Sequence, residues 1–267
     1  MMTRALGWRR PTVTHAWRCQ VLAGPAAGLS VLADVVAAPR SDLYRLCQVR
    51  DQGPYGSCQT QAMIQAVRAA QVKAGAVDPP WASAMGIYAM ARGMEGHMDA
   101  DDGAAIGSAF FVGAEWGLPP ESEWPYDGAL LRSRPGPAVD RAAFDSRGAI
   151  GLHYHPLTTR GEAFIEDVER ALTAGMIVPF GVEVTEDFCT HQPSGIVQPP
   201  GAHDSIAGGH AMCLIGHDHE RRVFRVLNSW GDGWGDPNEP PGCCLFSYDY
   251  AALAADAWCV PKVTVLS

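Results

Sequence analysis

One cysteine stands where a thiol can act as a nucleophile. Cys58 ends the turn-rich stretch 52–57 and directly precedes residues 59–75, whose apolar positions recur at helical spacing. The first turn of a helix leaves backbone N–H groups unpaired and carries a partial positive charge. Both features stabilise a thiolate over a thiol, and the thiolate is the reactive form. The sequence therefore predicts a nucleophilic cysteine at a helix start.

A histidine and an asparagine further along the chain can complete a catalytic group around this cysteine. A thiol nucleophile needs a base, and that base needs a partner that fixes its ring. His210 enters a run of β-type residues behind Gly208-Gly209, and Asn228 follows the next such run. If these runs pair as a hairpin, the Asn228 carbonyl can accept a hydrogen bond from the His210 ring. Gln52 can offer its amide hydrogens to a developing oxyanion.

These residues lie in a series of motifs that resembles the papain-like cysteine peptidases (peptidase family C1), with features of bacterial-type members. The resemblance covers nearly the whole chain, because stretches outside the catalytic motifs also match. The catalytic motifs, in chain order, are Gln52-Gly53, Gly56-Ser57-Cys58, Gly209-His210-Ala211, Asn228-Ser229-Trp230-Gly231 and Trp234-Gly235. The other stretches are Leu6-Gly7-Trp8, Asp42-Leu43, Asp102-Gly103-Ala104 and the segment from Glu121 to Tyr126.

The resemblance implies a function and a role for each side chain. A cysteine endopeptidase hydrolyses protein or peptide substrates through a thioester acyl-enzyme, and we expect no cofactor. In this chain it implies Cys58 as nucleophile and His210 as general base and then acid. It also implies Asn228 as the residue that orients the histidine and Gln52 as an oxyanion donor. The substrate-binding positions that we expect are Asp102, Gly103, Gly209 and Trp230.

The implied fold is α+β, with a helical left lobe, a β-barrel-like right lobe and the active-site cleft between them. The sequence pattern agrees, because helical spacing dominates the first half and short β-type runs dominate the second. We expect an N-terminal arm over 1–45, a helical lobe over 46–145 and a β-rich lobe over 146–267. The expected helices are 59–75, 83–92, 104–116 and 162–174, and the expected strands are 177–184, 210–216, 222–228 and 243–248.

Two positions in the nucleophile loop depart from the family pattern. Tyr55 replaces a cysteine that normally forms a disulfide, and Gln59 replaces an aromatic residue. The resemblance thus implies that the left-lobe disulfide of the family is absent here, which fits folding in a reducing compartment. The eight cysteines show no even spacing and no CxxC pair, which gives little support to a cysteine-rich zinc site.

Composition limits the classes of partner. The 267 residues include 20 Lys and Arg against 29 Asp and Glu, for a net charge of −9. An acidic surface repels a phosphate backbone, so we expect no nucleic-acid partner. No apolar run reaches transmembrane length, so we expect no membrane partner.

The N-terminal segment is interpreted as an arm rather than a leader. The apolar stretch 21–38 follows several arginines, but Pro25 and Asp34 interrupt it and it begins late for a secretory signal. Too few residues precede Gln52 for the long inhibitory pro-region of lysosomal relatives, so we do not expect a pro-segment zymogen. We expect a cytoplasmic protein, or an effector secreted without a conventional signal peptide.

Alternatives stay open at this point. The same scaffold can carry an amidase, a deamidase or a transpeptidase, or a catalytically silent binding homologue. His217 and His219 could suggest a metal cluster, but we interpret them as part of a solvated turn and expect no metal site. A bacterial toxin or effector would add a cognate inhibitor or immunity protein as a partner. The sequence leaves the oligomeric state open.

Overall fold

The computed structural model describes residues 4–11 and 32–265, which form an α+β fold. The helical elements are η1 (Tyr44–Leu46), α3 (Cys58–Lys73), α4 (Ala84–Glu95), α5 (Ile106–Glu115), η2 (Gly128–Leu130), α6 (Pro137–Ala149), α7 (Glu162–Thr173), α8 (Glu186–Thr190) and α9 (Tyr248–Ala251). The strands are β1 (Arg40–Asp42), β2 (Ile150–Pro156), β3 (Val178–Thr185), β4 (Ile196–Val197), β5 (Ile206–Asp218), β6 (Val223–Leu227), β7 (Cys243–Ser247) and β8 (Asp256–Val265).

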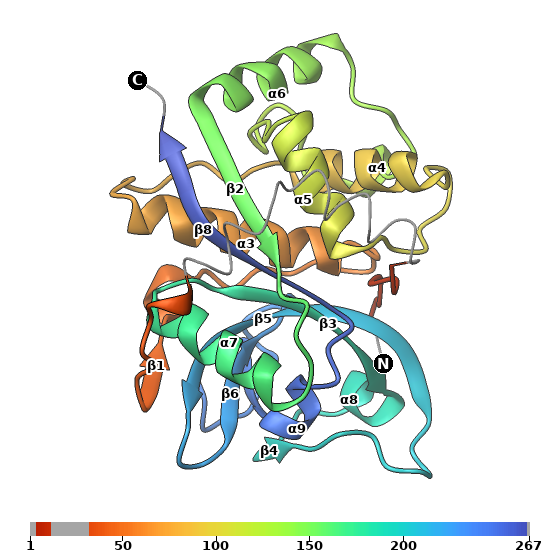
Figure 1. Cartoon of the computed structure of the whole chain (residues 1–267). Coiled ribbons are helices and arrows are strands. Elements are labelled where there is room, and N and C mark those ends of the chain that lie inside the picture. The colour runs from red at the N-terminus through yellow and green to blue at the C-terminus, as the bar shows by residue number, and fades with distance from the viewer. Residues whose placement is uncertain (1–3, 12–31, 266–267) are drawn as a thin grey trace.

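Helices and sheet occupy different parts of the molecule. Figure 1 shows α4, α5 and α6 on one side and the strands β3, β5, β6 and β4 on the other, with α7 and α9 beside the sheet. Helix α3 lies between these parts and packs against both α5 and β5. Its first half, from Cys58 to Val67, is buried all round, as expected for a helix without a solvent-facing stripe. This burial fixes the helix start that carries Cys58.

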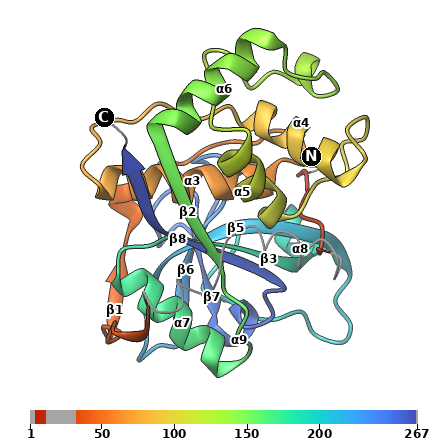
Figure 2. The same cartoon turned by 45° about the horizontal axis from the view of Figure 1, so that its top comes forward.

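One sheet links the strands in the order β2-β8-β3-β5-β6-β7-β4, and β1 pairs with β5. All of these pairs are antiparallel except β4 with β7. Strands β5 and β6 form the hairpin that the sequence predicts, with Cys213 opposite Leu227. At the other end of the sheet, β2 and β8 run as a long ribbon toward α6, which Figure 2 shows from above. Within the described residues, no helix is long and apolar enough to cross a membrane.

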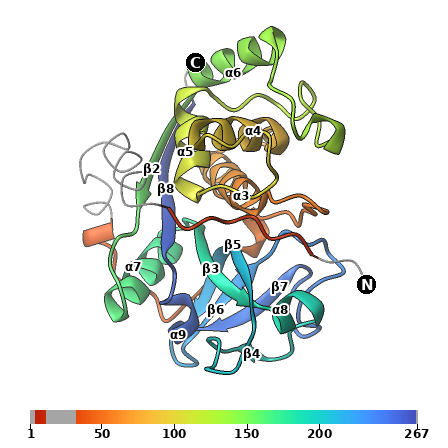
Figure 3. The ribbon, with the colours of Figure 1, turned by 90° about the vertical axis from the view of Figure 1, so that its right-hand side faces the viewer.

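The described part of the N-terminal arm runs between the helices and the sheet. Figure 3 shows residues 4–11, in red, crossing the molecule between α3 and α5 on one side and β3 and β5 on the other. Trp8 forms an isolated parallel bridge with Ala104, at the start of α5. The arm therefore contacts both parts of the fold. The predicted arm also includes 1–3 and 12–31, which lie outside the described residues.

The four predicted helices and the four predicted strands are all present, with boundaries shifted by a few residues. The sequence pattern did not predict β2, β8 and α6, nor the short elements β1, β4, α8 and α9. Helix α6 begins at Pro137, where the proline-rich connection ends. Proline suits the first turn of a helix because its missing N–H would be unpaired there in any case.

The prediction of a solvated turn at His217 is wrong. His217 lies in β5 and is only 4% exposed. Its Nδ1 lies 2.7 Å from Ser41 Oγ and its Nε2 lies 2.8 Å from the Ala38 carbonyl oxygen. The reason is long-range pairing, because β1 pairs with the end of β5 at His217.

Candidate active site

Cys58 is the first residue of α3, and its side chain is 0% exposed. The backbone N–H groups of Gln59 and of Cys58 itself lower the pKa of the thiol. Ala211 N, on β5, donates to the sulfur at 3.4 Å. The helix start therefore favours the thiolate of Cys58, in the direction that the sequence predicts.

His210 and Asn228 meet at the end of the β5–β6 hairpin. His210 Nε2 lies 2.8 Å from Asn228 Oδ1. The Ser229 backbone N–H donates to the same Oδ1 at 2.7 Å, so this atom of the amide is the acceptor. His210 Nε2 must then carry the hydrogen, and Nδ1 of the neutral ring holds the free lone pair. That lone pair is what a general base needs.

Trp230 covers the histidine. Its ring stacks on the His210 ring with centroids 4.4 Å apart and an interplanar angle of 21°. Phe188 and Trp234 pack against Trp230 in turn. This aromatic cluster keeps water away from the His210–Asn228 hydrogen bond and strengthens it.

The structure brings Cys58 and His210 to adjacent positions without a hydrogen bond between them. The contact runs through Ala211, the neighbour of His210 in the chain. His210 Nδ1 is buried and has no hydrogen-bond partner among the described residues. A small movement of the ring or the thiol is therefore needed before a proton can pass between them, as is common for catalytic pairs in unliganded enzymes.

Gln52 is fixed by three hydrogen bonds of its side chain. Its Nε2 donates to the Tyr55 carbonyl at 2.8 Å and to the Ala5 carbonyl at 3.1 Å. Its Oε1 accepts a 2.6 Å hydrogen bond from Ser229 Oγ. One amide hydrogen therefore already binds a carbonyl oxygen of a peptide that passes the site, which is the contact expected of an oxyanion donor.

Burial keeps the cysteine and the histidine neutral in this conformation. It raises the pKa of Cys58 to about 12, although the surrounding backbone N–H groups oppose the rise. Burial also lowers the pKa of His210 to about 4, a shift that the Asn228 hydrogen bond opposes and the charge of Arg4 reinforces. The helix start alone therefore does not create a thiolate here, because desolvation outweighs it. A thiolate of Cys58 paired with a charged His210 requires water to reach the site.

The arm occupies the space in front of these residues. Its Gly7 carbonyl accepts a 2.9 Å hydrogen bond from Ala104 N, and its Trp8 N donates to the Gly209 carbonyl at 3.2 Å. Gln52 binds Ala5 on the same segment. The arm thus spans the helical and the sheet side of the site as one extended peptide.

All four positions predicted to bind substrate contact this arm. Gly209 accepts the hydrogen bond from Trp8, and a Cβ atom at Gly103 would lie 1.8 Å from the Gly7 carbonyl oxygen. Arg4 lies over the Trp230 ring, with its Cζ 5.0 Å from the centroid. The remaining contact joins Asp102 Oδ2 to Arg9 Nη1 at 3.0 Å.

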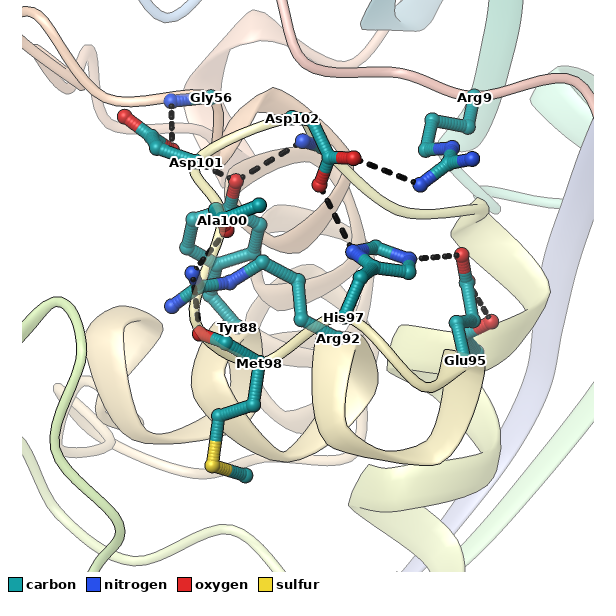
Figure 4. Close-up of polar contacts among 12 residues, drawn as sticks. Arg9, Gly56, Tyr88, Arg92, Glu95, His97, Met98, Ala100, Asp101 and Asp102 are labelled. Carbon is teal, nitrogen blue, oxygen red and sulfur yellow. Dashed lines mark hydrogen bonds and ion pairs between the residues drawn. The ribbon is translucent and has the colours of Figure 1, made fainter.

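A network of polar contacts shapes the loop that carries Asp101, Asp102 and Gly103 (Figure 4). Buried Arg92 donates to the carbonyls of Met98 and Ala100. Asp101 accepts from Gly56 N at 3.0 Å and from the Tyr88 hydroxyl at 2.7 Å, which ties the loop to the nucleophile segment.

The outer side of the same loop carries a chain of charged groups. His97 lies between Glu95, at 3.1 Å, and Asp102, at 2.7 Å, and Asp102 reaches Arg9 of the arm (Figure 4). The acidic residues of this loop thus hold both the nucleophile loop, through Asp101, and the arm, through Asp102.

Several supporting residues escaped the sequence analysis. The hydrogen bonds of Ser229 with Gln52, of Asp101 with Gly56 and of Asp256 with Trp8 were not predicted, although Ser229 lies inside a recognised motif. Tyr126, in the Trp-Pro-Tyr stretch, donates a 2.8 Å hydrogen bond to the Gln52 carbonyl. Its ring meets Tyr55 edge-on at 5.8 Å, which shows what the unusual residue at position 55 does in place of a cysteine.

No group of three or more histidine, cysteine, aspartate or glutamate side chains within 4–11 and 32–265 could hold a metal ion. His219 instead lies 2.6 Å from Glu169, and His217 bonds to β1 and the preceding residues. The histidines that could have suggested a cluster are thus engaged separately.

Comparison with known proteins shows similarity to cysteine proteases. Residues 37–238 match the model of the papain family of cysteine proteases. An uncharacterized peptidase C1-like protein of Acanthamoeba polyphaga mimivirus is 30% identical over 246 residues, which cover 89% of this chain and 75% of that protein. The crystal structure of xylellain, a cysteine protease from Xylella fastidiosa, matches with a TM-score of 0.81 and 26% identity over 98% of this chain and 97% of that one.

A more distant structure shares the fold. The Carica candamarcensis cysteine protease CMS1MS2, solved in complex with E-64, matches with a TM-score of 0.58 at 18% identity. The match covers 84% of this chain and 99% of that chain. The α+β arrangement described above is therefore the papain-like fold.

Proposed function

Because the chain belongs to the papain family of cysteine proteases, we propose that it is an endopeptidase with Cys58 as its nucleophile. It is a cysteine peptidase, and therefore a hydrolase that acts on peptides or proteins. The observation that carries the proposal is the junction of α3 and β5. There Ala211 N contacts the Cys58 sulfur at 3.4 Å, while the adjacent His210 is held by Asn228 at 2.8 Å.

Acylation uses each of these groups. His210 Nδ1 takes the thiol proton, and the Cys58 sulfur attacks the carbonyl carbon of the scissile peptide. Gln52 Nε2 and the Cys58 N–H bind the oxygen as it becomes negative. The C–N bond then breaks, and His210 returns the proton to the leaving amine. A thioester to Cys58 remains.

Deacylation repeats the steps with water. His210 takes a proton from a water molecule, whose oxygen attacks the thioester carbon. The same two donors bind the oxyanion, the C–S bond breaks, and the proton returns to the sulfur. Asn228 keeps the ring in the tautomer that both steps need, because its Oδ1 fixes the hydrogen on Nε2.

Internal cleavage, rather than trimming of chain ends, is supported by the path of the arm. An extended chain passes Cys58 and continues in both directions, with Arg4 on the Trp230 side and Arg9 at Asp102. A site that admits a peptide on both sides of the nucleophile suits an endopeptidase. The predicted roles of Asp102, Gly103, Gly209 and Trp230 in substrate binding rest on the same path.

Substitution of the proposed catalytic residues tests the function. Cys58→Ala and His210→Ala should abolish cleavage of an unfolded protein substrate, and Gln52→Ala should lower the rate by about 10²–10³. The wild type should be labelled at Cys58 by E-64, the inhibitor bound in the Carica candamarcensis and Ananas comosus enzymes. Peptidase activity that survives Cys58→Ala would refute the assignment.

Identification of new chain ends distinguishes peptidase activity from the alternative activities, and an effector from a general peptidase. Mass spectrometry after exposure of a whole proteome to the wild type or to Cys58→Ala detects backbone cleavage as new N-termini, whereas amidase, deamidase or transpeptidase chemistry on side chains creates none. Cleavage of one or two proteins would favour an effector, whereas broad cleavage would favour a general peptidase. The effector role and a cognate inhibitor or immunity protein stay predictions.

A further inference from the structure

The Asn228 amide has one half that the proposed mechanism does not use. Its Oδ1 accepts from the His210 ring at 2.8 Å and from the Ser229 backbone N–H at 2.7 Å. Its Nδ2 therefore faces the other way, and this buried atom has no hydrogen-bond partner among the described residues. Asn228 is only 2% exposed, so bulk solvent does not reach the nitrogen. A buried amide nitrogen without a partner is costly, so a partner is expected.

A second buried amide, on α3, has the same unpaired half. Gln61 lies one helical turn after Cys58 and is 1% exposed, and its Oε1 accepts a 3.0 Å hydrogen bond from Arg50 Nε. An arginine can only donate, so the Gln61 oxygen must face Arg50 and the nitrogen must face away from it. Within the part of the chain that the structure describes, Gln61 Nε2 is buried and has no hydrogen-bond partner. Both unpaired nitrogens occur where α3 packs on the β5–β6 hairpin (Figure 1).

Gln61 and Asn228 line one small cavity. Its volume is about 10 Å³, which is the room that a single water molecule needs. Arg50 and Ser229 also line it, together with apolar residues of β5 and β6. Two N–H donors cannot hydrogen-bond to each other, so a group that joins them must accept from both. The oxygen of one water molecule, with its two lone pairs, is such an acceptor.

The Gln61 amide also lies near a tyrosine of the site. Burial raises the pKa of Tyr126 to about 12, and Gln61 is among the groups that oppose this rise. The Tyr126 hydroxyl in turn donates to the Gln52 carbonyl at 2.8 Å. An amide nitrogen carries two hydrogens, so one can face the tyrosine while the other faces the cavity.

An ion pair holds Gln61 in its orientation. Arg50 Nη2 contacts the two carboxylate oxygens of Glu121, at 3.0 and 2.9 Å. The guanidinium also lies over the Trp81 ring, with its Cζ 4.5 Å from the centroid. Arg50 is thus fixed on two sides, and its Nε is directed at Gln61. A chain of directed contacts therefore runs from Glu121 through Arg50 and Gln61 to the cavity beside Asn228.

We infer that Gln61 is a positioning residue for His210 and acts through one bound water molecule. The water oxygen accepts from Gln61 Nε2 and from Asn228 Nδ2. Together with the Ser229 N–H, it stops the Asn228 amide from turning over and presenting a donor to the histidine. The hydrogen on His210 Nε2, and with it the free lone pair on Nδ1, depends on that orientation. This inference rests on the proposed function, because it concerns the same histidine.

Nuclear magnetic resonance of the histidine ring nitrogens tests the positioning without requiring turnover. The wild type and Gln61→Met are compared at neutral pH, each with isotope-labelled histidine, and His210→Gln identifies the His210 signals. Methionine has about the size of glutamine but no polar hydrogen. The wild type should show one tautomer of His210, with the hydrogen on Nε2. In Gln61→Met the Nε2 and Nδ1 signals should shift toward each other, because both tautomers are populated.

Gln65→Met is the matched control. Gln65 is another buried glutamine of α3 and lines the same cavity, but both ends of its amide pair with the Gln48 backbone. Its replacement should leave the His210 signals at their wild-type positions. Shifted signals in both variants, or in neither, would overturn the inference.

Steady-state kinetics measures what the positioning contributes. Gln61→Met should lower kcat by about fivefold with little change in KM, because the water supplies one hydrogen bond to a group that acts in the transition state. In an Asn228→Ala background the same substitution should cause little further loss. Losses that multiply in the double variant would show that Gln61 acts by another route and would overturn the inference. A wild type that shows the expected tautomer but cleaves no peptide would overturn the proposed function instead.

Crystallography of the wild type keeps the inference testable if Gln61→Met does not fold. One peak of electron density should lie within about 3.2 Å of both Gln61 Nε2 and Asn228 Nδ2. Crystals grown in bromide distinguish a water molecule from an anion attracted by Arg50, because only bromide gives an anomalous signal. A peak without anomalous signal supports the inference. An anomalous signal at this position, or no peak there, would overturn it.

Discussion

Ser229 Oγ donates a 2.6 Å hydrogen bond to Gln52 Oε1 and thereby determines which way the Gln52 amide points. The amide nitrogen faces two carbonyl oxygens, those of Ala5 and Tyr55, which can only accept. The oxygen must therefore face the serine, which can donate. A residue next to Asn228 thus orients the proposed oxyanion donor as well as the histidine partner.

Replacement of this serine should weaken catalysis through Gln52. We expect Ser229→Ala to lower kcat by about fivefold with little change in KM, because one neutral hydrogen bond of about 1 kcal/mol orients a group used mainly in the transition state. Steady-state kinetics on a peptide substrate measures the effect.

The control is the same substitution in a Gln52→Ala background. There Ser229→Ala should cause little further loss, because the group that it orients is already gone. Losses that simply add in the double variant would show that Ser229 acts independently of Gln52.

Tyr88 joins the nucleophile loop to the loop that faces the arm. Its hydroxyl donates to Asp101 and accepts from Gly103 N at 3.0 Å, and Asp101 in turn holds Gly56 N. Tyr88→Phe should lower the free energy of unfolding by about 1–3 kcal/mol, because it leaves a buried N–H unpaired. Chemical denaturation measures this change.

Tyr55→Phe is the matched control for Tyr88→Phe. The Tyr55 hydroxyl has no hydrogen-bond partner among the described residues, although its ring packs on Tyr126. We expect its removal to change stability by no more than about 0.5 kcal/mol. Equal losses of stability in the two variants would mean that the hydrogen bonds of the Tyr88 hydroxyl do not stabilise the fold.

The sequence indicated the site because the chemistry constrains the order and spacing of its parts. Strands β5 and β6 pair as a hairpin, and this pairing brings Asn228, at the end of β6, to His210. The predicted helix does start at Cys58, and its first backbone N–H groups lower the pKa of the thiol. These local elements can be predicted from the sequence because short-range periodicity and turn residues determine them.

The sequence predicts an N-terminal arm over 1–45, but the path of this arm was beyond sequence reasoning. Leu6-Gly7-Trp8 was recognised as a motif, but an extended segment has no periodicity that reveals its partners. Its contacts join Trp8 to Asp256 and Gly181, far away in the chain. The strand β8 that carries Asp256 was itself missed, so these contacts could not be anticipated. The same long-range burial favours the thiol form of Cys58, whereas the sequence alone predicts a thiolate.

Gly117 should tolerate no side chain. It has a φ of +122°, and a Cβ atom there would lie 2.0 Å from the Ala143 carbonyl oxygen of α6. Gly117→Ala should therefore destabilise the fold by more than about 2 kcal/mol, through both backbone strain and displacement of α6. Gly233→Ala is the control, since nothing lies within 4 Å of its Cβ position. Thermal unfolding of the two variants at equal concentration tests this prediction. Similar unfolding midpoints would contradict the close approach of α6 to Gly117.

The free energy of unfolding should fall in mild acid because of His210. Burial lowers the pKa of His210 to about 4, whereas an unfolded histidine titrates near about 6.5. Between these values the folded protein binds fewer protons than the unfolded chain, so acid favours unfolding. The contribution of His210 is complete above about pH 6.5 and is lost as the pH falls toward about 4, a change on the order of 3 kcal/mol.

Urea denaturation at a series of pH values across this window, on the wild type and on His210→Gln, isolates that contribution. Glutamine does not titrate, and its amide can still donate to Asn228 Oδ1. His155, whose pKa burial also lowers, is present in both proteins, so its effect cancels in the difference. The wild type should lose stability more steeply than His210→Gln as the pH falls. For Trp8→Ala, the loss of stability with falling pH should be less steep than in the wild type and steeper than in His210→Gln. Removal of the Trp8 side chain admits water to His210 and moves the charge of Arg4 away from it. Parallel pH profiles for wild type and His210→Gln would mean that His210 is not buried in its neutral form.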